Sequence, residues 1–171
     1  MCFGGHGYIR EWGMEQCIRD LRISQIYEGT NGVQAIDLIG RKTTKCSGAF
    51  IAEYIADIRE FAVSMADSKV KAAAVQVCSD VEDLTQFIVE QSKTAPDFSN
   101  AVAVDYLHAV GLLSFVYMFA RISQAAASKP EPFYQNKLVL ADYYVAKVLP
   151  DLAARAQRIK AGSELIMQLP E

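Results

Sequence analysis

The chain has 171 residues, of which 51% are apolar and 22% are charged. This composition excludes intrinsic disorder, collagen and low-complexity architectures, and the length predicts about one domain. The 17 Lys and Arg residues are outnumbered by 20 Asp and Glu residues, so the chain has no basic excess for binding the phosphates of a nucleic acid.

The cysteines indicate the cellular compartment. Cys2, Cys17, Cys46 and Cys78 form no Cys-x-x-Cys pair, and the N-terminal sequence has no apolar signal segment. We therefore expect reduced thiols and a cytoplasmic location. Cys17, Cys46 and Cys78 are expected to be buried small apolar residues rather than reactive thiols.

The first candidate binding segment is the glycine-rich stretch over residues 3–8. Gly4, Gly5 and Gly7 lack side chains, which lets a ligand or another backbone approach to contact distance. The stretch matches neither of the two glycine-rich phosphate-binding patterns. A mobile N-terminus that binds nothing is the alternative interpretation. His6 has no Cys, Asp or second His nearby, so no metal site is predicted.

The second candidate segment covers residues 26–34, where Glu28 precedes a glycine and a helix start follows at once. Thr30 or Asn31 can cap that helix, and with Asn31 as the cap Gln34 would complete a capping-box arrangement. The free N–H groups at a helix N-terminus attract an anionic or oxygen-rich ligand. A capped helix preceded by an exposed Glu, with no ligand, is the alternative.

Helical periodicity covers the rest of the chain, and strand alternation is not seen. The apolar spacing predicts a helix after Cys46 whose inner face runs over residues 51–65, and further helices over residues 69–92, 98–128 and 133–160. Pro96 ends the second of these helices, Pro150 kinks the last one and Gly162 ends it. Long helices joined by short loops predict an all-α antiparallel bundle, preceded by the glycine-rich loop and short helices.

Residues 101–120 are apolar enough to imitate a membrane span, but Asp105 and His108 interrupt them. We therefore expect a buried central helix and no membrane span. Asp105 and His108 lie on one face of this helix and are expected to form a buried hydrogen-bonded pair. A pair that orients a base or binds a metal is the alternative.

The aromatic cluster of this segment is expected in the core. Its members are Phe115, Tyr117, Met118 and Phe119. If the cluster were exposed instead, it would indicate a subunit interface.

Three motifs stand together in the first part of the chain: Gly4-Gly5-His6-Gly7-Tyr8-Ile9, Arg19-Asp20 and Ile26-Tyr27-Glu28-Gly29-Thr30-Asn31-Gly32. In this order and spacing they resemble the end of the acyl-CoA dehydrogenase family. The resemblance is close over residues 3–42, and the remainder is weakly similar to the C-terminal helical extension of the longer family members.

The resemblance implies a flavoenzyme that removes two hydrogens across the α and β carbons of an acyl-CoA thioester. Glu28 matches the catalytic base of that family, while Tyr27 and Gly29 match positions that line the substrate. A carboxylate suits the role because it must take a weakly acidic C–H proton while the β-hydride leaves to the flavin. In the family, the backbone N–H of this Glu also helps to hold the thioester carbonyl.

The resemblance also implies FAD as the cofactor. Thr30 and Asn31 match positions that contact the flavin. Gly4 and Gly5 match paired glycines that approach FAD across a subunit boundary in this family. Acyl-CoA as the substrate, an electron-transfer flavoprotein as the electron acceptor and a homo-oligomeric assembly are the expected partners.

The domain organisation follows from the same comparison. Residues 1–45 are expected to be the end of the C-terminal helical domain of an acyl-CoA dehydrogenase, and residues 46–171 a helical-bundle extension that serves assembly or a substrate channel. The family's N-terminal helical domain and β-domain have no counterpart in this sequence, so the isolated chain is expected to hold FAD poorly and to be inactive. A non-catalytic helical interaction module descended from the family is the alternative.

Overall fold

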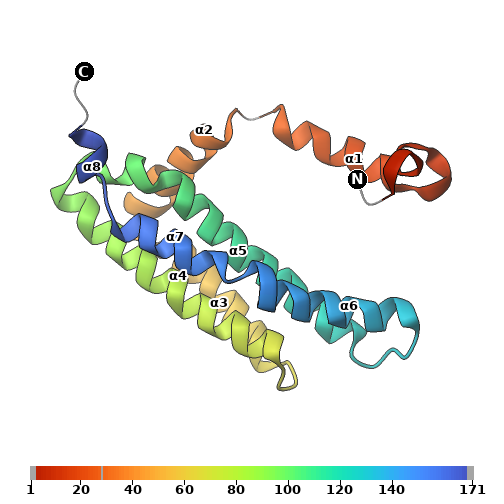
Figure 1. The fold of residues 1–171 in the computed structure, drawn as a ribbon. Coiled ribbons are helices and arrows are strands. Elements are labelled where there is room, and N and C mark those ends of the chain that lie inside the picture. Colours follow the sequence, from red (N-terminus) through yellow and green to blue (C-terminus); the bar gives the residue numbers. More distant parts are fainter. Residues whose placement is uncertain (1–2, 28, 169–171) are drawn as a thin grey trace. The chain divides into compact units, whose positions relative to one another are not determined.

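The computed structural model describes residues 3–27 and 29–168, and every regular element among them is helical (Figure 1). The predicted all-α class is therefore confirmed. The chain divides into two compact units, residues 1–34 and residues 35–171. The domain boundary expected at residue 45 stays a prediction.

The first unit consists of short helices. They are the 3₁₀ turns η1 (Gly4–Tyr8) and η2 (Arg10–Trp12), the helix α1 (Met14–Arg22) and the 3₁₀ turn η3 (Ile23–Gln25). The sequence analysis predicted short helices before the bundle but gave no range for α1. None of these four elements contains a buried residue, so the unit has no hydrophobic core among its described residues.

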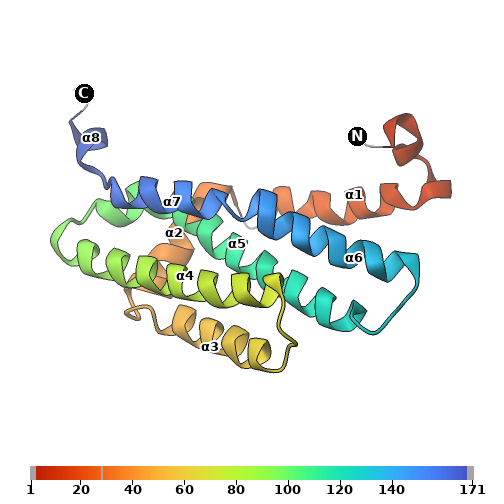
Figure 2. The same ribbon diagram turned by 60° about the horizontal axis from the view of Figure 1, so that its bottom comes forward.

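The second unit is a helical bundle, and the boundary between the two units falls within α2, after Gln34. Its elements are α2 (Asn31–Ile36), η4 (Asp37–Thr44), α3 (Ala49–Val63), α4 (Lys69–Thr94), α5 (Phe98–Ala126), α6 (Pro132–Tyr143), η5 (Tyr144–Val148), α7 (Asp151–Lys160) and α8 (Glu164–Met167). The long helices run antiparallel to their neighbours, with α3 packed on α4 and α5 packed on α4, α6 and α7 (Figures 1 and 2). The predicted antiparallel bundle is confirmed.

Helix α4 shows how the sequence dictates this packing. The stripe of apolar residues predicted from the alternating spacing of four and three is buried along its whole length: Val70, Ala74, Val77, Val81, Leu84 and Ile88. Burying each of the larger side chains contributes about 1.5–3 kcal/mol. Ser68 caps the helix by accepting a hydrogen bond from the Lys71 N–H at 3.1 Å, and Ala95, the residue before Pro96, is extended as expected.

The last predicted helix is interrupted as the sequence indicates, although by two features rather than one. Pro150 separates η5 from α7, because it lacks the N–H that a continuous helix requires. Just before it, η5 is a π-helical turn in which the Leu149 N–H donates to the Tyr144 carbonyl at 2.9 Å. A second π-helical stretch, η4, lies between α2 and the turn that precedes α3, and it was not predicted.

The turn into α3 requires a glycine at Gly48. Its φ angle of 81° lies in the left-handed region, and a Cβ placed there would lie 2.9 Å from the Thr85 Cγ2 atom. A side chain at this position would therefore be strained and would also push α3 away from α4.

Helix α5 is long and apolar enough to cross a membrane, with a mean hydropathy of 1.6 over its most apolar window. In the structure it is the central helix of the bundle, as predicted, and its Tyr106, Ala109 and Leu113 are fully buried. Only 39% of that window is buried, however, so a substantial face of the helix is exposed.

Alkaline pH is expected to destabilise the bundle through Tyr144. Its phenol donates to the Leu112 carbonyl at 3.2 Å. Its ring stacks on the Phe119 ring, with the two ring centroids 4.7 Å apart. Burial raises the pKa of Tyr144 to about 12, above the ordinary value of about 10. Because the folded state favours the neutral phenol, the stabilisation is complete below about pH 10 and is lost as the pH rises towards 12.

The variant Tyr144→Phe isolates this effect, since it keeps the ring but cannot ionise. Urea unfolding between pH 9 and 12 should show a smaller loss of stability in the variant than in the parent chain, by about 1.4 kcal/mol for each unit of pKa difference. Equal losses in the two proteins would show that Tyr144 does not titrate in the folded state.

Candidate active site

The glycine-rich segment lies at one end of α1. Gly4 and Gly5 are both exposed in η1, and an added Cβ at either would meet nothing within 4 Å. Gly4 adopts the left-handed backbone, with a φ of 54°. The backbone of both glycines is therefore open to a ligand, which is the property that the sequence predicted for them.

The second candidate segment follows the other end of α1 and η3. The Tyr27 N–H donates to the Ile23 carbonyl at 3.1 Å, and the Tyr27 side chain is 48% exposed. Gly29 has a φ of 97°, and a Cβ there would approach the Val33 Cγ1 atom to 3.3 Å. A glycine at this position thus permits a turn that leads directly into α2.

The structure decides which residue caps α2. Thr30 Oγ1 accepts from the Val33 N–H at 3.4 Å, and the Thr30 carbonyl accepts from the Gln34 N–H at 3.1 Å. Asn31 is the first helical residue, with an exposed side chain. Of the two candidate caps, the structure therefore has Thr30.

Glu28, the predicted base, lies outside the described residues, so its surroundings stay a prediction. Tyr27, Gly29, Thr30 and Asn31 are its neighbours in the sequence. Gly4 and Gly5 lie beyond the opposite end of the α1–η3 rod, whose twelve residues span about 18 Å (Figure 1). Within one copy, the two groups of predicted flavin-contacting residues are thus not brought into one site.

The predicted Asp105–His108 pair is wrong, because His108 is exposed and Asp105 pairs with another helix. The Asp105 carboxylate accepts from Arg155 Nη1 at 2.8 Å and from Arg158 Nε at 3.0 Å, both on α7. The hydrogen bonds of Arg155 to Asp105 and to Asp151 raise the pKa of Arg155, and the two pairs of Asp105 tie α5 to α7. In the part of the chain that the structure describes, no group of three or more His, Cys, Asp or Glu residues could hold a metal.

Two expectations about small and aromatic side chains also need correction. Cys78 is buried, and burial raises the pKa of its thiol, but Cys46 is only partly buried and Cys17 is exposed. In the aromatic cluster of α5, Tyr117 and Phe119 are partly buried, whereas Phe115 and Met118 are exposed. The expected core position of Phe115 and Met118 is therefore wrong.

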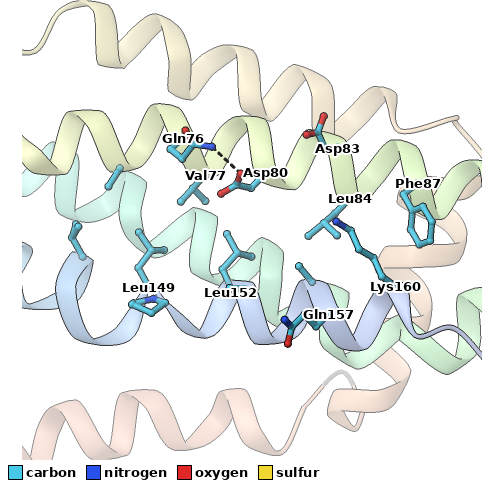
Figure 3. A pocket seen from close by; sticks show the side chains of 15 residues that line it. Gln76, Val77, Asp80, Asp83, Leu84, Phe87, Leu149, Leu152, Gln157 and Lys160 are labelled. Atoms are coloured by element: carbon cyan, nitrogen blue, oxygen red, sulfur yellow. Dashed lines mark hydrogen bonds between the residues drawn. The ribbon is translucent and has the colours of Figure 1, made fainter.

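A groove of about 810 Å³ lies in the bundle between α4 and the η5–α7 segment (Figure 3). Its floor is apolar, with Val77 and Leu84 of α4 facing Leu149 and Leu152. The rim is polar: Gln76 Nε2 donates to Asp80 Oδ1 at 2.9 Å, and the Lys160 side chain extends from α7 towards Leu84.

Two family models match almost the whole chain. The model described as acyl-CoA dehydrogenase, C-terminal domain, matches residues 1–43, and the model described as acetyl-CoA dehydrogenase C-terminal like matches residues 51–170. The first match includes both candidate segments. The second covers the long helices of the bundle.

Curated relatives point to the same family. The chain is 27% identical to the broad-specificity linear acyl-CoA dehydrogenase FadE5 of Mycobacterium tuberculosis, over 98% of the chain and 30% of that protein. It is 26% identical to a butyryl-CoA dehydrogenase of Syntrophomonas wolfei, over 99% of the chain and 30% of the relative. Over a shorter stretch of 32 residues it is 56% identical to a short-chain specific acyl-CoA dehydrogenase of Megasphaera elsdenii.

The chain thus spans about a third of the length of the relatives that it matches throughout. The family models, the all-helical fold and these relatives agree with one another. The chain belongs to the acyl-CoA dehydrogenase family and corresponds to the C-terminal portion of its longer members.

Proposed function

We propose that this chain supplies the catalytic base, Glu28, for the FAD-dependent α,β-dehydrogenation of an acyl-CoA thioester. The observation that carries the proposal is the position of Tyr27-Glu28-Gly29-Thr30 within the residues matched to the family's C-terminal domain. The relatives named above act on linear, butyryl or short-chain acyl-CoA, which supports this substrate class.

The residues of this segment divide the chemistry between them. The Glu28 carboxylate takes the proton from the α carbon, and the electron pair of that C–H bond becomes the new carbon–carbon double bond as the β-hydride departs. The Glu28 backbone N–H donates to the thioester carbonyl oxygen, which makes the α proton more acidic. Tyr27 and Gly29 line the acyl thioester on either side of the base.

FAD supplies the hydride acceptor when it is bound. The residues present fit a part of its binding site: the open backbone of Gly4 and Gly5 admits a close approach, and Thr30 and Asn31 present exposed polar groups at the start of α2. The separation of these two groups by α1 and η3 supports a flavin site to which two copies of the chain contribute. An electron-transfer flavoprotein is the proposed acceptor of the electrons.

The complete dehydrogenase assembled with this chain is expected to lose its flavin absorbance when a linear acyl-CoA is added without oxygen. The reason is that removal of the two hydrogens reduces the bound FAD, and the product is the α,β-unsaturated acyl-CoA. Visible spectra and mass analysis of the thioester measure the two changes together. Free coenzyme A is the control, because it binds through the same nucleotide but has no acyl carbon to oxidise.

The 171-residue chain by itself provides a second comparison. Since none of the described residues of its first unit is buried, the chain has no enclosed site there, and it is expected to purify without flavin and to leave acyl-CoA unchanged. If no linear acyl-CoA bleaches the flavin of the complete dehydrogenase, the proposed reaction is wrong. If the isolated chain binds FAD at one per chain, only its expected inactivity is wrong.

A further inference from the structure

The groove between α4 and the η5–α7 segment follows both of its walls over several helical turns (Figure 3). On α4 its lining residues extend from Ala73 to Phe87, and on the facing segment they extend from Val145 to Lys160. At a rise of about 1.5 Å per residue, each wall is about 21 Å long. The groove therefore has the length of a helix of about 15 residues.

Small and partly exposed apolar side chains stand above the buried floor of the groove. Ala73 of α4 and Ala156 of α7 are partly buried, and Ala153 of α7 is exposed. Side chains this short let the backbone of another helix approach to the distance of about 8–10 Å at which helices pack. Phe87 and Val145 are also only partly buried, so an occupant would remove more of their apolar surface from water.

The direction of the two walls also suits a helix. Helices α4 and α7 run parallel to each other, and α5 packs against both of them in the antiparallel direction (Figures 1 and 3). The described lining residues of the groove belong to α4 and to residues 145–160, so α5 does not fill it. A helix in the groove would pack on the same two helices as α5 does.

The charges at the rim indicate the chemistry of the occupant. Asp80 and Asp83 stand on the α4 side of the groove. Asp80 accepts a hydrogen bond from Gln76, but neither carboxylate forms an ion pair with any residue in the described part of the chain. Lys160 is the only cation among the described lining residues, and it lies at one end of the opposite wall. Basic side chains on an occupant would thus meet two carboxylates that have no cationic partner.

We propose that the groove binds an amphipathic helix of a partner protein. The apolar face of that helix fills the groove, and Lys or Arg residues beside this face pair with Asp80 and Asp83. An acidic residue near one end of the helix pairs with Lys160. The proposal does not depend on the catalytic role proposed for Glu28.

A fatty acid is a poorer occupant of this groove. Its carboxylate would have Lys160 as its one cationic partner, and Asp80 and Asp83 would repel it. Its hydrocarbon chain would also leave both of these carboxylates without a partner. A basic amphipathic helix satisfies the apolar walls and the acidic rim together.

Fluorescence anisotropy with two synthetic peptides tests the proposal on the full chain. Each peptide is a helix of about 15 residues with leucine at alternating spacings of three and four. One peptide has lysine beside the leucine stripe, and the other has glutamate at the same positions. The chain is expected to bind the lysine peptide at least about tenfold more tightly than the glutamate peptide, because only lysine can pair with the acidic rim.

A bulky side chain in the groove should block the peptide. Ala153→Trp fills the groove from an exposed position, so it should weaken binding of the lysine peptide at least about tenfold. Ala146→Trp is the matched control, because Ala146 is exposed on η5 and does not line the groove, and the affinity should stay within about twofold. Thermal unfolding followed by circular dichroism shows whether each variant folds.

Reversing the charge of the rim should reverse the preference between the two peptides. The double variant Asp80→Lys and Asp83→Lys is expected to bind the glutamate peptide more tightly than the lysine peptide. Glu53→Lys and Asp57→Lys together make the same change in net charge at exposed positions of α3 and should keep the preference for lysine.

Three results would overturn the proposal. The first is a parent chain that shows no preference for the lysine peptide. The second is equal binding of that peptide by the parent chain and Ala153→Trp, and the third is the same effect from both charge reversals. Binding of oleate that Ala153→Trp abolishes, without binding of either peptide, would assign the groove to a fatty acid instead.

Discussion

Replacing Glu28 with Gln is expected to lower the kcat of the complete dehydrogenase by about 10²–10⁴-fold while FAD stays bound. Glutamine has nearly the size and shape of glutamate but cannot accept the α proton of the thioester. Its backbone N–H remains available to the thioester carbonyl, so the affinity for acyl-CoA should change little. The measurement is the rate of product formation, together with the visible flavin spectrum and the acyl-CoA dissociation constant.

Two further variants separate the loss of the base from general damage. Glu11→Gln makes the same chemical change at an exposed position of η2 and should leave kcat within about twofold, as expected of a surface substitution. Glu28→Asp keeps a carboxylate but shortens its reach by one methylene, so its kcat should lie between those of the parent enzyme and Glu28→Gln. A kcat for Glu28→Gln within tenfold of the parent value would remove Glu28 from the role of base.

The helices with a clear polar face were predictable from the sequence. In α4 the stripe from Val70 to Ile88 alternates with charged and polar residues, so the buried face follows directly from the spacing. Helix α5 was predicted as an element but not in orientation. Nearly every side of it is apolar, so periodicity gives no reason to place Tyr106 inside and Phe115 outside.

The ion pair between distant residues and the π-helical turn could not be predicted from the spacing of residues in the sequence. Asp105 meets Arg155, which is fifty residues further along the chain, and local spacing favoured the nearby His108 instead. The π-helical turn at η5 depends on how the chain accommodates Pro150 within the bundle, and no single residue type marks it. Both features arise only when the helices pack together.

The candidate site was predictable by resemblance rather than by physical reasoning from its residues. Local rules gave an N-cap at Thr30 or Asn31 and an open backbone at Gly4 and Gly5, and the structure has Thr30 as the cap and both glycines exposed. They could not assign a proton-transfer role to Glu28, because that role depends on groups that dehydrate the carboxylate and hold a substrate against it.

A buried polar cluster at the centre of the bundle joins three elements that are distant in sequence. Thr85 of α4 donates its hydroxyl to the Val81 carbonyl at 2.7 Å, so the Tyr106 phenol of α5 donates to the Thr85 oxygen, 2.8 Å away. Thr43 of η4 interacts with this phenol too, while its own hydroxyl donates to the Leu38 carbonyl at 2.9 Å. Burial raises the pKa of Tyr106, and the two threonines oppose part of that rise.

Replacing Tyr106 with Ala is therefore expected to destabilise the chain by about 3–5 kcal/mol. Tyr106 is fully buried, and its removal leaves a cavity where α4, α5 and η4 meet. Tyr106→Phe keeps the ring and should cost only about 0.5–1.5 kcal/mol, since both threonine hydroxyls retain a backbone carbonyl as a partner. Urea unfolding followed by far-ultraviolet circular dichroism gives these differences from the shift in midpoint at constant slope.

Tyr143→Ala is the matched control for the loss of an aromatic ring. Tyr143 lies on α6 with 59% of its surface exposed, so its removal should change the stability by no more than about 0.5 kcal/mol. If Tyr106→Ala and Tyr143→Ala had similar effects, Tyr106 would not be the residue that holds the bundle together at its centre. If Tyr106→Phe cost as much as Tyr106→Ala, the hydrogen bonds of the phenol rather than the packing of its ring would stabilise the junction.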